Sequence, residues 1–544
     1  MDTDTVELIL LPSRHRLRGA IGETILHTLQ RRNVPIGASC GGAGTCGECR
    51  VRFVGDAPPP TASDRTLIDR KDIAAGWRLA CCHALTETAT IELRSAGGSS
   101  DSPSAGASNA ENISPAVVNV EGAAPKTGSS AGSPKYGLAI DVGTTTLDAC
   151  LLDVAARRTL DSATSRNPQS RFGADVISRI AHVRRHGAAG LRELHEAVIA
   201  GLNLLINRLS RLAFVQPSSI RAVTVVGNPT MIHLLMAVDP TGMDVSPYTP
   251  KFLKSMRRHA SDIGLSVHPL ALVETLPAVS AYVGADIVAG ILATGLHETC
   301  GPTLFLDVGT NGEVVLAHGG RLIACSTAAG PAFEGASIVQ GLAAQPGAIE
   351  SVRITGGKVA CGVIGDEVPK GLCGSGLIAA VAELRTAGII DPSGRLTASN
   401  TCLADRLDGD GKNRRFRLTD EQPPVYLYQN DIREFQLGKA AIRAGIEVLS
   451  KHEQLSTQDI SRVLLGGAFS SALSSEHLVS TGLLPGITPT RIHIVGGSAG
   501  QGAQRVLLNR SLMQEVERIA RGVEYIELSG DRRFSDLFLG LMGL

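Results

Sequence analysis

Residues 139–146 read AIDVGTTT, and residues 305–312 read FLDVGTNG. In each segment an apolar run reaches an aspartate, Asp141 or Asp307, and then turns through glycine into polar residues. Such a turn can direct backbone N–H groups at phosphate oxygens while the carboxylate faces a metal ion. One copy alone would indicate an ordinary hairpin, because glycine and threonine are common in turns. The repeat therefore predicts two similar domains that face each other.

The sequence around these segments alternates short β-branched or apolar runs with long helical patterns. YGLAI, AVTVV, TLFLDV, RVLLG and RIHIV are typical of strands, whereas ADVISRIAHVRR and FQLGKAAIRAGIEVL are typical of helices. This alternation predicts an α/β architecture. A third motif, LGGAF at residues 465–469, follows a strand pattern. We expect two lobes, at residues 135–300 and 301–544.

The order of the three motifs resembles the superfamily of acetate kinase, sugar kinases, heat-shock proteins and actin (ASKHA). In that superfamily the two turns clasp the phosphates of ATP from opposite sides, and the later glycine pair lies against adenine and ribose. The resemblance implies binding of ATP and Mg²⁺, with Asp141 and Asp307 as the catalytic carboxylates. The remaining nucleotide-binding residues that it implies are Gly143, Thr144, Thr145, Thr146, Gly309, Thr310, Asn311, Gly312, Gly466, Gly467 and Ala468.

Other polar residues near these motifs carry weaker signals. Asn228 and Asp286 each precede a helical pattern, so N-capping alone would explain them. Glu313 and Glu334 follow the second turn, where they are candidates either for orienting a water molecule or for surface ion pairs. The segment CGSGLI at residues 373–378 is typical of a glycine-rich connector that leads into a helix and permits either close packing, which is favoured, or the approach of a phosphate. We assign none of these residues a catalytic role.

A cysteine motif, Cys40-GGAGT-Cys46-GE-Cys49, lies near the N-terminus and is followed later by Cys81. Five of the eleven cysteines crowd into this region, which favours metal binding over disulfides. Three thiolates on a glycine-rich loop and one remote thiolate suit a 2Fe-2S cluster, whose sulfurs accept hydrogen bonds from the loop. A structural zinc site is the alternative, but zinc sites rarely combine such a loop with a remote ligand. Cys82 competes with Cys81 as the fourth ligand.

The spacing of the first two cysteines resembles the adrenodoxin and putidaredoxin branch of ferredoxins. Strand and helix patterns lie on both sides of the loop, and the resemblance implies an α+β ferredoxin domain of the β-grasp type at residues 1–96. Residues 97–134 are rich in Ser, Gly, Ala and Pro and are typical of a flexible linker. The expected order is therefore ferredoxin domain, linker and two-lobed ASKHA domain.

The composition limits the partners of the protein. Lys plus Arg and Asp plus Glu both total 52, so no net charge directs the chain to nucleic acid. The N-terminal apolar run is too short for a signal peptide, and no run of about 18 apolar residues occurs elsewhere. We expect a cytoplasmic protein that binds neither nucleic acid nor membrane.

Seven segments together resemble the reductive activators of corrinoid proteins: CGGAGTCGEC, RNPQSRFGADVISRI, VVGNPTMIHLL, LDVGTNGE, GPAFEGASI, GLCGSGLI and VLLGGAF. The resemblance covers nearly all of the chain except the linker. It implies an ATP-hydrolysing enzyme that passes one electron from its 2Fe-2S cluster to a corrinoid protein, reducing Co(II) to Co(I) for methyl transfer. It also implies a homodimer and an electron donor, either a reductase or a reduced ferredoxin.

Three alternatives stay open. An ATP-driven activator of a radical dehydratase or aryl-CoA reductase would share the fold, but such activators usually hold a four-iron cluster without a ferredoxin domain. A small-molecule kinase with a regulatory cluster would show no turnover without a phosphoryl acceptor. A non-enzymatic ferredoxin scaffold is disfavoured by the retention of Asp141 and Asp307.

Overall fold

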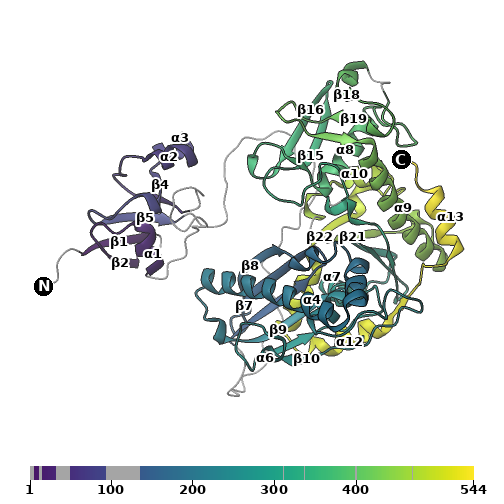
Figure 1. Ribbon diagram of the computed structural model, residues 1–544, viewed down its shortest axis with the longest axis horizontal. Coiled ribbons are helices and arrows are strands. Elements are labelled where there is room, and N and C mark those ends of the chain that lie inside the picture. The colour runs from purple at the N-terminus through teal and green to yellow at the C-terminus, as the bar shows by residue number, and fades with distance from the viewer. Residues whose placement is uncertain are drawn as a thin grey trace. The chain divides into compact units, whose positions relative to one another are not determined.

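The computed structural model describes two compact units, one on each side of residues 94–134 (Figure 1). The predicted linker at 97–134 lies outside the described residues, as do Cys40, Cys46, Thr310 and Ala468. The residues described are 5–11, 15–31, 49–93, 135–309, 311–335, 337–397, 401–467 and 470–544.

The first unit is built on a mixed five-stranded sheet with the strand order β2-β1-β5-β3-β4. Strands β1 and β5 are parallel, and the other neighbours are antiparallel. Leu26 and Leu29 of helix α1 pack in one apolar core with Leu8, Val51 and Ile91 of the sheet. The elements are β1 (Thr5–Leu11), β2 (His15–Ala20), α1 (Ile25–Arg31), β3 (Arg50–Phe53), α2 (Ala62–Leu67), α3 (Arg70–Ala74), β4 (Trp77–Leu79) and β5 (Ala89–Leu93).

The second unit contains two six-stranded sheets with the same local topology. In the order β10-β11-β9-β6-β7-β8, strands β6 to β8 form an antiparallel meander, and β9 lies parallel to β6. In the order β22-β21-β12-β13-β14-β23, strands β12 to β14 form the meander, and β21 lies parallel to β12. The internal repeat in the sequence therefore corresponds to a repeat in topology.

The strands of the first sheet are β6 (Tyr136–Val142), β7 (Thr146–Asp153), β8 (Arg158–Arg166), β9 (Ile220–Gly227), β10 (Arg257–His259) and β11 (Leu272–Thr275). Those of the second sheet are β12 (Thr303–Val308), β13 (Gly312–His318), β14 (Arg321–Thr327), β21 (Arg462–Gly466), β22 (Ile492–Gly496) and β23 (Val523–Tyr525). Two three-stranded sheets comprise β15 (Ala348–Thr355), β16 (Lys358–Val363), β17 (Gly371–Leu372), β18 (Leu407–Asp408), β19 (Arg415–Arg417) and β20 (Tyr426–Tyr428).

Two helices, α7 (Ala285–Thr294) and α11 (Ser498–Leu508), share an apolar core with both large sheets. Their backbones approach closely, because a methyl group at Gly502 would lie 2.2 Å from the carbonyl oxygen of Ala289. A methyl group at the adjacent Gly290 would lie 2.7 Å from the ring of Phe305 in β12. The small residues therefore let this helix pair fit against the second sheet.

Other helices surround the sheets (Figure 1). None of the helices in the described part of the chain is long and apolar enough to cross a membrane. The remaining helices are α4 (Val176–Leu212), α5 (Pro229–Leu235), α6 (Ala260–Ile263), α8 (Gly374–Thr386), α9 (Gln429–His452), α10 (Ser475–Ser480), α12 (Leu512–Gly522) and α13 (Arg532–Gly540).

Candidate functional site

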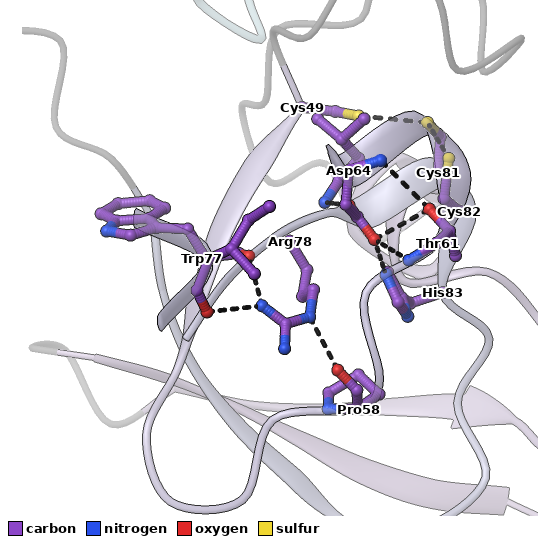
Figure 2. A network of polar contacts seen from close by, with 11 residues as sticks. Cys49, Pro58, Thr61, Asp64, Trp77, Arg78, Cys81, Cys82 and His83 are labelled. Carbon is purple, nitrogen blue, oxygen red and sulfur yellow. Dashed lines mark hydrogen bonds and ion pairs between the residues drawn. The ribbon is translucent and has the colours of Figure 1, made fainter. Parts of the chain in front are cut away.

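The described half of the candidate cluster site consists of Cys49 and Cys81 (Figure 2). Cys49 directly precedes β3, and Cys81 lies in the short 3-10 segment Ala80–Cys82 that follows β4. Because β3 and β4 pair in antiparallel fashion, the two cysteines meet at the same end of the sheet. Their Sγ atoms are 3.3 Å apart, and the N–H of Ala80 donates to the carbonyl oxygen of Cys49 at 2.7 Å.

The two competing cysteines differ in position. The Sγ of Cys81 contacts Cys49, whereas the Sγ of Cys82 lies 3.6 Å from that of Cys81. Burial raises the pKa of the Cys81 thiol, and the neighbouring thiols raise it further. Iron must therefore displace a proton when it binds there. This geometry supports Cys81 as the fourth ligand, which remains a proposal.

The first predicted phosphate turn joins β6 to β7, and side chains from distant segments hold it. Asn167 Nδ2 donates to the carbonyl oxygen of Gly143 at 2.8 Å, and Arg179 donates to that of Thr144 at 2.5 Å. Asn228 Nδ2 donates to the hydroxyl oxygen of Thr144 at 2.9 Å. Buried and partly buried hydrogen bonds thus hold the conformation of this turn.

The second predicted turn joins β12 to β13, and the N–H of Gly309 donates to the carbonyl oxygen of Asn311 at 2.9 Å. Strand β21 ends at Gly466 beside this turn, and the next residue, Gly467, has a φ of +94°. A methyl group there would lie 2.8 Å from the carbonyl oxygen of Val308 and 3.1 Å from Asp307 Oδ1. Only glycine permits this approach without strain.

The first sheet has the same close contact between a glycine and a turn, at Gly227, which the sequence motifs did not assign. Strand β9 ends in Gly227, where a methyl group would lie 2.6 Å from the carbonyl oxygen of Val142. Val142 and Val308 occupy equivalent places in the two DVGT segments. Gly227 and Gly467 are therefore structural counterparts, and each packs against one of the predicted phosphate turns.

Four half-buried carboxylates from both sheets and from α7 converge on the two turns. Burial raises the pKa of Asp307 to about 7, with a further contribution from the charge of Asp286. Burial also raises the pKa of Asp286 to about 6. The pKa values of Asp141 and Glu313 lie well above the usual range, first through burial and then through Asp286. A divalent cation would relieve this mutual repulsion, so the donor set fits Mg²⁺.

A hydrogen bond beside the turns connects the two predicted lobes. The hydroxyl of Thr145 donates to Glu334 Oε2 at 2.6 Å. The charges of Asp175 and Glu334 act on the guanidinium of Arg179, but burial outweighs them and lowers its pKa to about 10. Glu334 therefore lies beside both the first turn and the arginine that supports it.

The structure corrects or extends several weaker interpretations. Asn228 caps α5, accepting from the N–H of Met231 at 2.9 Å, and it also contacts the first turn. Asp286 is not an N-cap, because Gly284 holds that position and the carboxylate joins the acidic cluster. The sequence motifs did not assign Arg179 to the site, although a cation within the apolar pattern VISRIAHV indicates a buried charge with a specific partner. Residues 374–378 are not a connector, because α8 begins at Gly374, but the predicted close packing is present where Gly374 lies against the backbone of Phe333.

Comparison with known proteins covers both units. The model of the 2Fe-2S iron-sulfur cluster binding domain matches residues 9–86, the RACo middle region matches 136–299, and the C-terminal ASKHA domain of RACo matches 301–544. The corrinoid activation enzyme RamQ of Eubacterium limosum is 32% identical over 75% of this chain and 70% of its own length. The chain belongs to the RACo family.

Two further relatives agree with this RACo assignment. The solved structure of a reductive activator for corrinoid, iron-sulfur protein is 31% identical and has a TM-score of 0.71, covering 99% of this chain and 98% of its own. The Co(II) methylated amine-specific corrinoid protein reductase of Methanosarcina barkeri is 24% identical over 74% of this chain and 76% of its own length.

The RACo assignment confirms the predicted fold class, a ferredoxin domain followed by an ASKHA domain. It also confirms the expectation of an enzyme with a 2Fe-2S domain and an ATP-binding domain. The matched iron-sulfur region spans all four predicted cluster ligands, Cys40, Cys46, Cys49 and Cys81. The individual roles of these cysteines and of the nucleotide-site residues stay predictions.

Proposed function

We propose that this RACo-family enzyme uses ATP to drive the transfer of one electron from its 2Fe-2S cluster to a corrinoid protein, converting Co(II) to Co(I). The observation that carries the proposal is the presence, in one chain, of a ferredoxin cysteine site and paired phosphate turns with converging carboxylates. Relatives over most of the chain are named for corrinoid activation and corrinoid protein reduction, which supports the same assignment.

In the ferredoxin domain, Cys40, Cys46, Cys49 and Cys81 would hold the cluster, which supplies a single electron when bound. The close contact between Cys49 and Cys81 supports this ligand set. Zinc binding is less consistent with the iron-sulfur domain match. The role of the protein here is to exclude other metals and to set the reduction potential through its hydrogen bonds.

In the ASKHA domain, Asp141, Asp286, Asp307 and Glu313 would hold Mg²⁺ between the two turns. Backbone N–H groups and hydroxyls of residues 143–146 and 309–312 would contact phosphate oxygens, while residues 466–468 would lie against the nucleoside. The pKa values of these carboxylates are raised by burial and mutual repulsion, which a bound cation would offset. The Thr145–Glu334 hydrogen bond lies where a bound phosphate would influence both lobes.

ATP is needed because electron transfer from the cluster to Co(II) is thermodynamically unfavourable. Plant-type ferredoxin clusters have potentials near about −400 mV, and each unfavourable gap of about 59 mV costs a factor of ten for one electron. Preferential binding of one state of the corrinoid protein can offset that gap, provided that ATP hydrolysis then releases the partner. Conformational change in the two-lobed domain would supply this coupling.

Several further features belong to the same proposal. We infer a homodimer in the cytoplasm, reduced by a reductase or a reduced ferredoxin. The domain boundaries at residues 96, 134 and 300, with a flexible linker at 97–134, also remain proposals. They are consistent with separate family matches to residues 9–86, 136–299 and 301–544.

The decisive experiment follows Co(II) to Co(I) conversion optically, with reduced protein, Mg²⁺–ATP and a corrinoid protein from the same organism. Conversion should require ATP and should be lost in both Asp307→Asn and Cys49→Ser. Asp410→Asn and Cys300→Ser, which alter exposed residues, serve as controls. Failure to convert, despite an intact cluster and ATP hydrolysis, would favour activation of another radical enzyme. Absence of ATP turnover until a small-molecule acceptor is added would favour the kinase.

A further inference from the structure

The ferredoxin domain contains a fully buried carboxylate, Asp64, close to the candidate cluster site (Figure 2). Asp64 lies in α2 and accepts four hydrogen bonds. Two come from the backbone N–H and the hydroxyl of Thr61, at 2.7 and 2.8 Å. The others come from the N–H of Leu79 at 2.8 Å and from His83 Nε2 at 2.7 Å.

A capping role explains only half of these contacts. Thr61 is the N-cap of α2, and its reciprocal bonds with Asp64 form a capping box. Leu79 and His83 belong to a different part of the chain and have no role in that cap. They stand at the two ends of the segment 79–83, which contains Cys81. One carboxylate thus holds this segment at both ends.

The surroundings keep Asp64 charged and in place. Burial alone would raise the pKa of Asp64, but the hydrogen bonds from Leu79, His83 and Thr61 outweigh burial and lower it. Arg78 lies nearby as a buried counter-charge, donating to the carbonyl oxygens of Pro58, Ile73 and Trp77. Asp64 is therefore ionised at neutral pH and its neighbours are fixed.

We propose that Asp64 is a positioning residue for the iron-sulfur cluster: it clamps residues 79–83 at both ends so that the Sγ of Cys81, rather than that of Cys82, faces Cys49. The inference rests on the proposed cluster function. The middle of the segment is held as well, since the N–H of Ala80 donates to the carbonyl oxygen of Cys49. Between these fixed points the cysteine backbone has little freedom to rotate.

Two measurable consequences follow. Loss of the clamp releases the fourth ligand, so iron should leave the cluster at least about tenfold faster, as expected when buried charge-assisted hydrogen bonds are lost. Loss of a buried negative charge near the cluster also favours the reduced state, so the midpoint potential should rise. A residue that merely stabilised α2 would not change the electronic spectrum or the potential of a cluster that had assembled.

The test compares full-length Asp64→Asn with Asp69→Asn. Asp69 is the matched control, because it is an exposed aspartate in the same connection and makes no side-chain cap hydrogen bond. We expect Asp64→Asn to show a shifted or broadened electron paramagnetic resonance signal of the reduced cluster, a higher midpoint potential and faster bleaching. Asp69→Asn should match the unaltered protein in all three measurements.

A second variant keeps the test decisive if Asp64→Asn does not fold. His83→Phe removes one end of the clamp, and it retains an aromatic ring beside Phe53, whose ring centroid lies 6.4 Å from that of His83. It should change the signal and the bleaching rate in the same direction, by less. If the unaltered protein gives no 2Fe-2S signal, the proposed cluster function fails. If the unaltered protein gives a 2Fe-2S signal and both variants have the same signal, the positioning role of Asp64 is rejected while the cluster function stands.

Discussion

The hairpins β6–β7 and β12–β13 carry the same Asp-Val-Gly-Thr signature, yet they are fixed by different means. At each turn a glycine packs closely: Gly227 at the end of β9 and Gly467 directly after the end of β21. The first also accepts hydrogen bonds from the side chains of Asn167, Arg179 and Asn228. Around the second, the described contacts are carboxylates, backbone and one hydroxyl, that of Thr327, which donates to the carbonyl oxygen of Gly312 at 2.9 Å. A repeated motif therefore reproduces the hairpin and its glycine, while the side chains that support the hairpin differ between the two copies.

If the hairpins contribute equally to Mg²⁺–ATP binding, Asp141→Asn and Asp307→Asn should each reduce ATP hydrolysis at least about 100-fold. The reason is that either change removes one of the charges that face the cation and the reacting phosphate. Steady-state ADP release measures the effect, and Asp410→Asn should leave it unchanged. A large loss in only one of the two variants would show that one turn acts alone.

The hydrogen bond that the buried Arg179 donates to the first hairpin predicts an effect on stability. Arg179→Met should lower the free energy of unfolding by about 2–4 kcal/mol, because it leaves buried carbonyl groups without a donor. Urea denaturation measures this, with exposed Arg185→Met on the same helix as control. Similar losses in the two variants would mean that the contacts of Arg179 with Thr144 and Gly173 contribute nothing specific.

Gly227 and Gly467, which pack against the two turns in the same way, test a feature that both hairpins have in common. Gly227→Ala and Gly467→Ala should each weaken nucleotide binding about tenfold, because the added methyl group forces the adjacent turn to shift and backbone strain of this kind costs about 1–3 kcal/mol. Calorimetric titration with Mg²⁺–ADP measures the loss. Gly496→Ala is the control, since Gly496 has a φ of +63° but no atom within 4 Å of the place that an added methyl group would take. An equal loss there would assign the effect to local strain alone.

The four carboxylates give the smallest expected effect, a dependence on pH. Their folded-state pKa values are raised, so between about pH 4 and about pH 7 the nucleotide-free protein retains protons that the unfolded chain releases. Its stability should therefore fall as pH rises through that window. Mg²⁺–ADP binds the deprotonated carboxylates, so the thermal stabilisation that it gives should grow with pH. A melting-temperature shift that stays constant from about pH 5 to about pH 8 would contradict this.

Local patterns in the sequence predicted the two turns at Asp141 and Asp307 and a site shared by Cys49 and Cys81, because each depends on a short motif or a known spacing. Arg179 and Asp286 were not assigned, because their roles arise only when distant helices meet the turns. Asp64 gave no signal at all, since a capping residue and a clamp look identical in sequence. Cys40, Cys46, Thr310 and Ala468 lie outside the described residues and stay predictions.

The backbone contact between α7 and α11 also determines where this chain can tolerate change over evolutionary time. A single extra carbon at residue 290 or 502 has no space to occupy, because the nearest atoms belong to a buried ring or to main chain. Neighbouring positions on the same helices can exchange one aliphatic side chain for another with modest repacking. Among distant relatives with this helix pair, these two positions should therefore remain glycine while the surrounding residues diverge.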